Sequence, residues 1–167
     1  MAETGTDSKF GRALESIANV FVLTGGGLLS MMSLLVVVSV LGRLLFSRPV
    51  PGDFEIVAIG TAISAFLSLP YCHLKRGNVS VDLFLANAPL RVRATLDGLA
   101  AALFGGIALV FAWRMSLGLK DVLHYRDVTM ILGMPVWLAY PFGIASFGVL
   151  ALTCAYTALR DLKSGRS

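Results

Sequence analysis

Four stretches of the chain contain no charged residue, and shorter polar segments separate them. The uncharged stretches are residues 16–42, 56–72, 98–113 and 128–159. A helix that crosses the hydrocarbon core of a bilayer, about 30 Å thick, needs about 20 residues at about 1.5 Å each. The first and last stretches exceed that length, and flanking basic side chains that reach the headgroups can extend the other two. The pattern predicts an all-α membrane protein with four transmembrane helices.

The segments between these stretches contain signals that end and begin helices. Pro49 and Pro51 end the first span, predicted to begin near residue 17, because proline cannot continue a helix. Asp53 is a candidate cap for the second span. Pro135 is expected in the first turn of the fourth span, and we expect a kink at Pro141. The third span is predicted to run from about residue 91 to about residue 119.

These boundaries predict one membrane domain with short polar ends. Residues 1–12 form a polar N-terminal segment, residues 13–162 hold the four spans, and residues 163–167 form a C-terminal tail. A cleaved signal peptide is the alternative interpretation of the first span. Its apolar stretch is far longer than the roughly 7–15 residues of such a peptide, which favours a retained helix.

The polar segment at residues 73–98 contains a second, shorter pattern. Ser80 is a plausible N-cap, Asp82 lies in the following turn, and Pro89 ends the segment. Apolar residues recur between them at helical spacing, at Val81, Phe84, Leu85 and Ala88. We expect a short amphipathic helix in the headgroup layer between spans two and three, with a simple loop as the alternative.

Composition and charge agree with a membrane location and suggest an orientation. Only 14% of the residues are charged, against roughly 25% in soluble domains. One side of the membrane would receive Lys9, Arg12, Lys75, Arg76, Arg91, Arg93, Arg160, Lys163 and Arg166. The other side would receive Arg43, Arg48, Lys120 and Arg126, with Arg114 near its end of span three. Because basic residues favour the cytoplasmic side, both termini are predicted there, and the net charge of +4 suits anionic lipid rather than nucleic acid.

The centres of the four spans hold no ionisable machinery. Arg43 and Glu55 lie near span ends, and Arg43 either reaches the headgroups or pairs with an acid on another helix. His73 and His124 fall at opposite membrane faces, so one haem cannot join them. The two cysteines, Cys72 and Cys154, form no CxxC motif. We therefore expect no enzyme activity, catalytic residue, metal site or cofactor in this chain.

Small residues recur at intervals of four in two spans. One set is Gly60, Ser64 and Ser68, and the other is Gly98, Ala102 and Gly106. Such ridges allow helices to approach closely in lipid. They pack either among the helices of this chain or against another subunit, and Arg43, Glu55, Gly60, Ser64 and Ser68 are our candidates for scaffold or interface residues.

The segment after span two reads LKRGNVSVDLFLANAPLRVR and resembles a family signature. It is similar to the Arg-Gly-x-His-Val/Ile-x-Val-Asp pattern of the DctQ-like small membrane subunits of tripartite ATP-independent periplasmic (TRAP) transporters. The matching residues are Arg76, Gly77, Val79, Val81, Asp82 and Pro89. Arg43 and Glu55 also fall at positions similar to the family's, whereas Asn78 stands where the family usually has His. The resemblance covers about residues 17–160.

The resemblance implies a role in a larger machine of the bacterial inner membrane. In this family the small subunit binds a large membrane subunit, which carries the substrate and sodium sites. A soluble periplasmic protein delivers an organic acid, and an ion gradient drives transport. The small subunit would enlarge the fixed scaffold and help to dock the periplasmic protein.

The polar segment would then form a cytoplasmic belt at the headgroups. This belt consists of Lys75, Arg76, Asn78, Val81, Asp82, Phe84, Leu85, Arg91 and Arg93. Two rival functions stay open. A stand-alone four-helix exporter would need a proton-exchanging carboxylate, for which Glu55 is the candidate. The other rival is a membrane anchor for a redox enzyme.

Overall fold

The computed structural model describes residues 9–47, 50–75 and 90–164. It contains four long helices: α1 (Lys9–Phe46), α2 (Asp53–Leu74), α4 (Leu90–Tyr125) and α5 (Tyr140–Ser164). A short 3-10 helix, η1 (Val136–Ala139), precedes α5. By length and composition, these helices include four segments that can cross a membrane, which agrees with the prediction from the sequence. The expected interfacial helix lies outside the described residues.

Two helix boundaries differ from the expected ones. Gly52, not Asp53, precedes the first residue of α2, and it adopts the left-handed conformation with φ 72°. Asp53 as the cap was therefore wrong, since it is already the first helical residue. Pro135 precedes η1 in an extended conformation, so it lies outside the first turn. Pro141 is the second residue of α5, where a missing N–H breaks no helical hydrogen bond and requires no kink.

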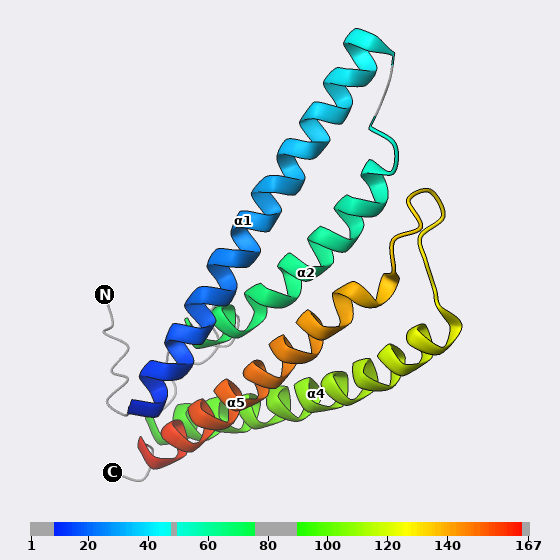
Figure 1. The fold of residues 1–167 in the computed structure, drawn as a ribbon. Coiled ribbons are helices and arrows are strands. Elements are labelled where there is room, and N and C mark those ends of the chain that lie inside the picture. The colour runs from blue at the N-terminus through cyan, green and yellow to red at the C-terminus, as the bar shows by residue number, and fades with distance from the viewer. Residues whose placement is uncertain (1–8, 48–49, 76–89, 165–167) are drawn as a thin grey trace.

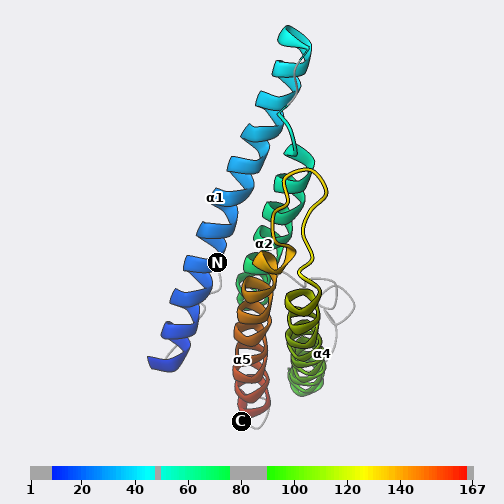
Figure 2. The same ribbon diagram turned by 45° about the vertical axis from the view of Figure 1, so that its right-hand side comes forward.

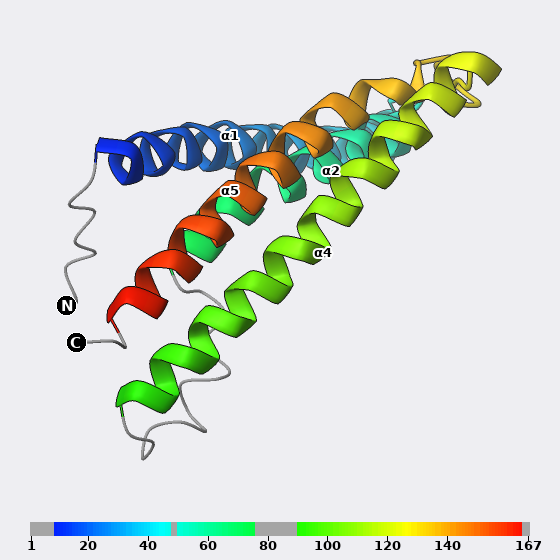
Figure 3. The same ribbon diagram turned by 90° about the horizontal axis from the view of Figure 1, so that it is seen from below.

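The four helices form an open layer in the order α1, α2, α5, α4 (Figures 1 and 2). α1 packs on α2, α2 on α5, and α5 on α4, whereas α1 touches α5 only slightly. Among the described residues, the backbone of α4 stays away from those of α1 and α2. α4 meets α2 through side chains, where the His73 and Phe104 rings stack 5.6 Å apart. Figure 3 shows the same arrangement from below, with α1 and α4 on the two outer sides. The chain therefore has two edge helices, which a closed four-helix bundle would not have.

α1 uses one narrow seam to pack on its neighbour. Its buried residues are Leu14 and a series at every seventh position, Gly11, Ala18, Gly25, Met32 and Ser39. This is the spacing of a coiled-coil seam, which keeps one stripe of a helix against a partner. The 38 residues of α1 extend about 57 Å at about 1.5 Å per residue, well beyond a bilayer core of about 30 Å. α1 must therefore tilt in the membrane or project from it.

Small residues let α2 approach α1 and α4 approach α5. A Cβ added at Gly60 would meet the Met32 side chain, and one at Gly25 would lie 3.1 Å from the Ser64 carbonyl oxygen. A Cβ at Gly105 would lie 2.9 Å from the Cβ of Cys154. Ala108, Leu150, Ala151 and Cys154 form a buried cluster at the same contact. Close packing thus holds together two helical hairpins, α1–α2 and α4–α5, as expected for helices in lipid.

Polar and aromatic contacts join the two hairpins across α2 and α5. The Ser146 hydroxyl of α5 donates a hydrogen bond to the Phe66 carbonyl of α2. The rings of Phe66 and Phe147 lie 5.7 Å apart. Near the end of α2, His73 Nε2 and Thr157 Oγ1 are 3.1 Å apart. The contact between α2 and α5 therefore depends on hydrogen-bonding and aromatic side chains rather than on a seam of glycines.

Candidate interaction surface

The start of α2 holds the connection between α4 and α5 in place. The Glu55 carboxylate accepts hydrogen bonds from the backbone N–H groups of Ile131 at 2.7 Å and Leu132 at 2.9 Å. Leu132 packs directly over Gly52, where an added Cβ would collide with its side chain. Glu55 therefore fixes a loop that lies more than 70 residues later in the chain.

The connection is an ordered turn with an apolar tip. The Thr129 N–H donates to the Met134 carbonyl at 2.9 Å, and the Met134 N–H donates to Thr129 Oγ1 at 2.9 Å. Gly133 takes a positive φ of 64°, which glycine adopts without strain. At the tip, Met130 is fully exposed and Ile131 is 66% exposed. Internal hydrogen bonds hold this loop in one conformation, and its tip is apolar and exposed. Such a loop is suited to contact another molecule or the membrane surface.

Asp53 connects the same end of the layer to α1. Its carboxylate accepts a hydrogen bond from the buried Ser39 hydroxyl of α1 and another from the Phe54 N–H at 2.8 Å. Arg43 lies one turn of α1 further on and is exposed. Among the described residues Arg43 forms no ion pair. The Arg43 charge nevertheless acts on the Asp53 carboxylate at the start of α2, so pairing of Arg43 with an acid of another helix stays a prediction.

The opposite end of the layer carries the described part of the predicted belt. Lys75 Nζ lies 2.9 Å from the Glu15 carboxylate of α1 and 5.7 Å from the centre of the Tyr71 ring. The hydrogen bond with Glu15 raises the pKa of Lys75 above its ordinary value. Arg91 and Arg93 lie in the first turn of α4. The other belt residues, Arg76, Asn78, Val81, Asp82, Phe84 and Leu85, lie outside the described residues.

The two predicted small-residue ridges behave differently. Gly60 and Ser64 are buried, and they lie toward α1 of the same chain. The Ser68 hydroxyl donates to the Ser64 carbonyl within α2 at 2.8 Å. In α4, Gly98 is buried, whereas Ala102 and Gly106 are exposed. The described residues therefore cover only the first residue of that ridge, and a contact with another subunit stays a prediction for both ridges.

Glu55 was singled out from the sequence, but its partners were not. The loop amides that it binds follow it by 76 and 77 positions, and no local pattern signals so distant a contact. The mixture of charged and apolar residues in the loop was visible, yet its turn geometry was not. Among the described residues, no group of three or more His, Cys, Asp and Glu side chains could hold a metal ion.

Comparison with known protein families gives one result that covers most of the chain. Residues 32–164 match the model of the DctQ component of tripartite ATP-independent periplasmic transporters. Neither the curated proteins nor the solved structures gave a match. Since the matched region is well over half of the sequence, the chain belongs to the DctQ family, the small membrane component of these transporters.

Proposed function

We propose that this chain is a scaffold subunit that braces a large membrane subunit during ion-driven uptake of an organic acid or similar carboxylate. The family match carries the proposal, because it covers the helices from the middle of α1 to the end of α5. In this proposal the large subunit holds the substrate and sodium sites, and the small subunit carries no cofactor. The protein lies in the bacterial inner membrane with both termini in the cytoplasm.

The open layer supports a bracing role, because the described residues leave one side of α1 uncovered. That side carries small and polar residues at spacings that place them on one helix face: Asn19, Gly26, Ser30 and Ser33. The hydroxyls of Ser30 and Ser33 donate to carbonyls within α1, so a neighbouring helix need not satisfy them. A face of this kind lets another helix approach closely. We assign it to the large subunit.

A second exposed side of α1 differs in chemistry. Ile17, Met31, Val38 and Leu45 recur along it, and all four are exposed. Large apolar side chains are suited to acyl chains, which fill irregular space around them. We assign this side to lipid, so α1 would separate protein from membrane at the edge of the layer.

The apolar tip of the loop at Met130 and Ile131 is our candidate for docking the periplasmic binding protein. On the proposed orientation this loop faces the periplasm, since it lies at the end of the layer opposite the start of α1 and the end of α5 (Figure 1). Glu55 would hold the tip in the conformation that the partner meets. The backbone hydrogen bonds of the loop favour a preformed contact surface.

The rival functions lose support from the same contacts. An exporter would need a carboxylate available for proton exchange, but Glu55 is engaged by two backbone amides near one end of α2. A haem-binding anchor would need two facing histidines. His73 lies near the end of α2 that adjoins Thr157, whereas His124 lies in the last turn of α4 at the other end of the layer.

Reconstitution into liposomes tests the proposal. Liposomes that contain this chain alone should show no uptake of a dicarboxylate or other organic acid under a sodium gradient. Addition of the large subunit and the binding protein should give uptake, and omission of this chain should abolish or strongly reduce it. Uphill transport by the isolated chain, or full uptake without it, would overturn the proposal.

A further inference from the structure

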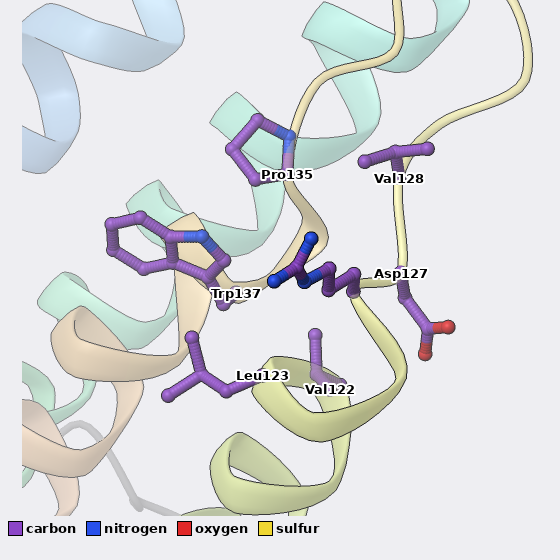
Figure 4. Close-up of a pocket in the computed structure, with 7 residues that line it drawn as sticks. Val122, Leu123, Asp127, Val128, Pro135 and Trp137 are labelled. Atoms are coloured by element: carbon purple, nitrogen blue, oxygen red, sulfur yellow. The ribbon is translucent and has the colours of Figure 1, made fainter.

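A pocket of about 270 Å³ opens where α4 ends and η1 begins. Leu123 and Trp137 lie on one side of it, and Pro135 and Val128 lie on another (Figure 4). Asp127 is at the rim, on the side away from Trp137 (Figure 4). The volume is slightly below that of pockets for drug-sized ligands, which fits a compact headgroup rather than a whole lipid.

The walls of this pocket are fixed by the backbone. The Val136 N–H donates to the Asp127 carbonyl at 3.1 Å, and the Asp127 N–H donates to the Val122 carbonyl at 3.2 Å. Val128 and Pro135 form an isolated antiparallel bridge across the loop. The pocket is therefore formed before any ligand arrives, which lowers the entropic cost of binding.

The position of the pocket matches the level of lipid headgroups. The apolar segment of α4 ends at Tyr125, and the apolar segment of the last span begins at Val136. A bilayer crossed by these candidate spans would place the pocket at its boundary with water. Trp137 is 38% exposed there, and tryptophan prefers this boundary because its ring is apolar and its N–H is polar.

Arg126 is an unusual residue for its backbone position in the pocket wall. Its φ is 53°, in the left-handed region that glycine adopts at lower cost and that commonly ends helices. Strain of this kind is often found where a side chain has a function. The only ion pair among the described residues is between Lys75 and Glu15 at the other end of the layer, so the Arg126 guanidinium has no carboxylate partner there.

The charges around the pocket suit a ligand that carries both signs. Arg126 offers a planar cation, which binds phosphate oxygens well. Asp127 and the last carbonyls of α4 offer negative charge beside it, which favours an ammonium and disfavours a purely anionic ligand. The Trp137 ring can also accept a cation. Leu123, exposed next to the pocket, continues toward the apolar surface of α4.

We infer that this pocket binds the zwitterionic headgroup of a phospholipid, a phosphate ester that carries an ammonium. Arg126 binds the phosphate, Asp127 binds the ammonium, and the acyl chains leave past Leu123 into the bilayer. The bound lipid fixes the depth of the α4–α5 hairpin at this end of the layer. This inference does not depend on the proposed function.

Native mass spectrometry of the full chain in detergent tests the inference, with phosphatidylethanolamine, phosphatidylglycerol and soluble glycerophosphoethanolamine as probes. Phosphatidylethanolamine should bind about tenfold more tightly than phosphatidylglycerol, as expected for one charge-assisted contact. Glycerophosphoethanolamine should bind more weakly still, because it lacks acyl chains. Equal binding of the two lipids would overturn the inference. If the soluble ester binds as tightly as the lipid, the ligand is a free phosphate ester and the lipid assignment fails.

The variants separate binding from folding. Arg126→Gly removes the guanidinium and suits the positive φ, so it should fold at least as well as the natural chain while binding phosphatidylethanolamine about tenfold more weakly. Asp127→Asn should abolish the preference for phosphatidylethanolamine over phosphatidylglycerol. Lys120→Gln, at an exposed cation of α4 outside the pocket, is the control and should change neither affinity. Unchanged binding in Arg126→Gly, or an equal loss in Lys120→Gln, would contradict the inference.

Discussion

The outer helix α1 and the inner helix α5 are both apolar, but the chain covers them very differently. In the most apolar part of α1, 11% of the residues are buried, against 33% in the last span, most of which is α5. α5 lies between α2 and α4, whereas α1 packs along one seam on α2. Hydrophobicity alone therefore does not say which helix is internal.

The difference in burial between α1 and α5 indicates how the layer can bind a partner. The contacts of α5 with α2 and α4 are made within the chain, so they stabilise the layer by themselves. α1 brings an extended surface that the described part of the chain leaves uncovered, and its seam on α2 orients that surface. Variants in the covered and uncovered regions should therefore affect different properties, folding in one region and assembly in the other.

The largest effect on folding is expected at the contact of α4 with α5. Gly105→Leu adds a side chain at a position where an added Cβ alone would lie 2.9 Å from the Cβ of Cys154, so it should destabilise the chain by about 1–3 kcal/mol through overpacking. Thermal unfolding in detergent measures the change. Gly106→Leu is the matched control, because an added Cβ there meets nothing within 4 Å. Equal losses in the two variants would show that α4 and α5 do not pack as described.

The next effect concerns the loop that Glu55 holds. Glu55→Ala removes the acceptor of two charge-assisted hydrogen bonds from the loop amides. The Ile131 and Leu132 amides should then exchange with solvent about tenfold faster or more, as hydrogen–deuterium exchange can measure. Asp121→Ala, at an exposed acid of α4, should leave their exchange unchanged. Protection that persists in Glu55→Ala would exclude Glu55 as the group that fixes the loop.

A smaller effect is expected between the two hairpins. Ser146→Ala removes the hydroxyl that donates to the Phe66 carbonyl and should lower stability by about 0.6 kcal/mol, the average for such bonds between membrane helices. Ser116→Ala removes a hydroxyl that donates to Ala112 within its own helix at 2.8 Å, so it should cost less. The comparison uses unfolding in the same detergent. A greater loss of stability in Ser116→Ala than in Ser146→Ala would contradict the described contact between α2 and α5.

The smallest effect is expected at the ion pair between α1 and α2. Glu15→Gln should lower stability by about 0.2–1 kcal/mol at low salt and by less at high salt, because the pair is partly exposed. The pKa of Lys75 is raised above 10.5 by this contact, so its stabilising contribution is complete below that pH and is lost as the pH rises through the raised pKa. Unfolding curves of the two proteins should therefore converge at high pH. A difference that persists there would contradict an ionic cause.

The sequence predicted the helices better than their arrangement. Uncharged stretches located all four spans, since lipid accepts only helices that satisfy their own backbone. The buried small residues of α4, such as Ala101 and Gly105, lie one position before Ala102 and Gly106, which the ridge pattern had selected. The small residues of α4 recur at intervals of three and four on more than one face of the helix, so the pattern alone could not identify the face that packs on α5. The bond from Glu55 to the distant loop depends on tertiary structure and left no local signal.

Photocrosslinking along α1 tests most directly whether this chain braces a partner through its uncovered side. A crosslinking residue is placed at Ser33 or at Met31, which lie at similar depth on different exposed sides, in cells that contain the whole transporter. The account predicts an adduct between Ser33 and the large membrane subunit and only lipid adducts at Met31. Lipid adducts alone at Ser33, or the same protein adduct from both positions, would contradict it.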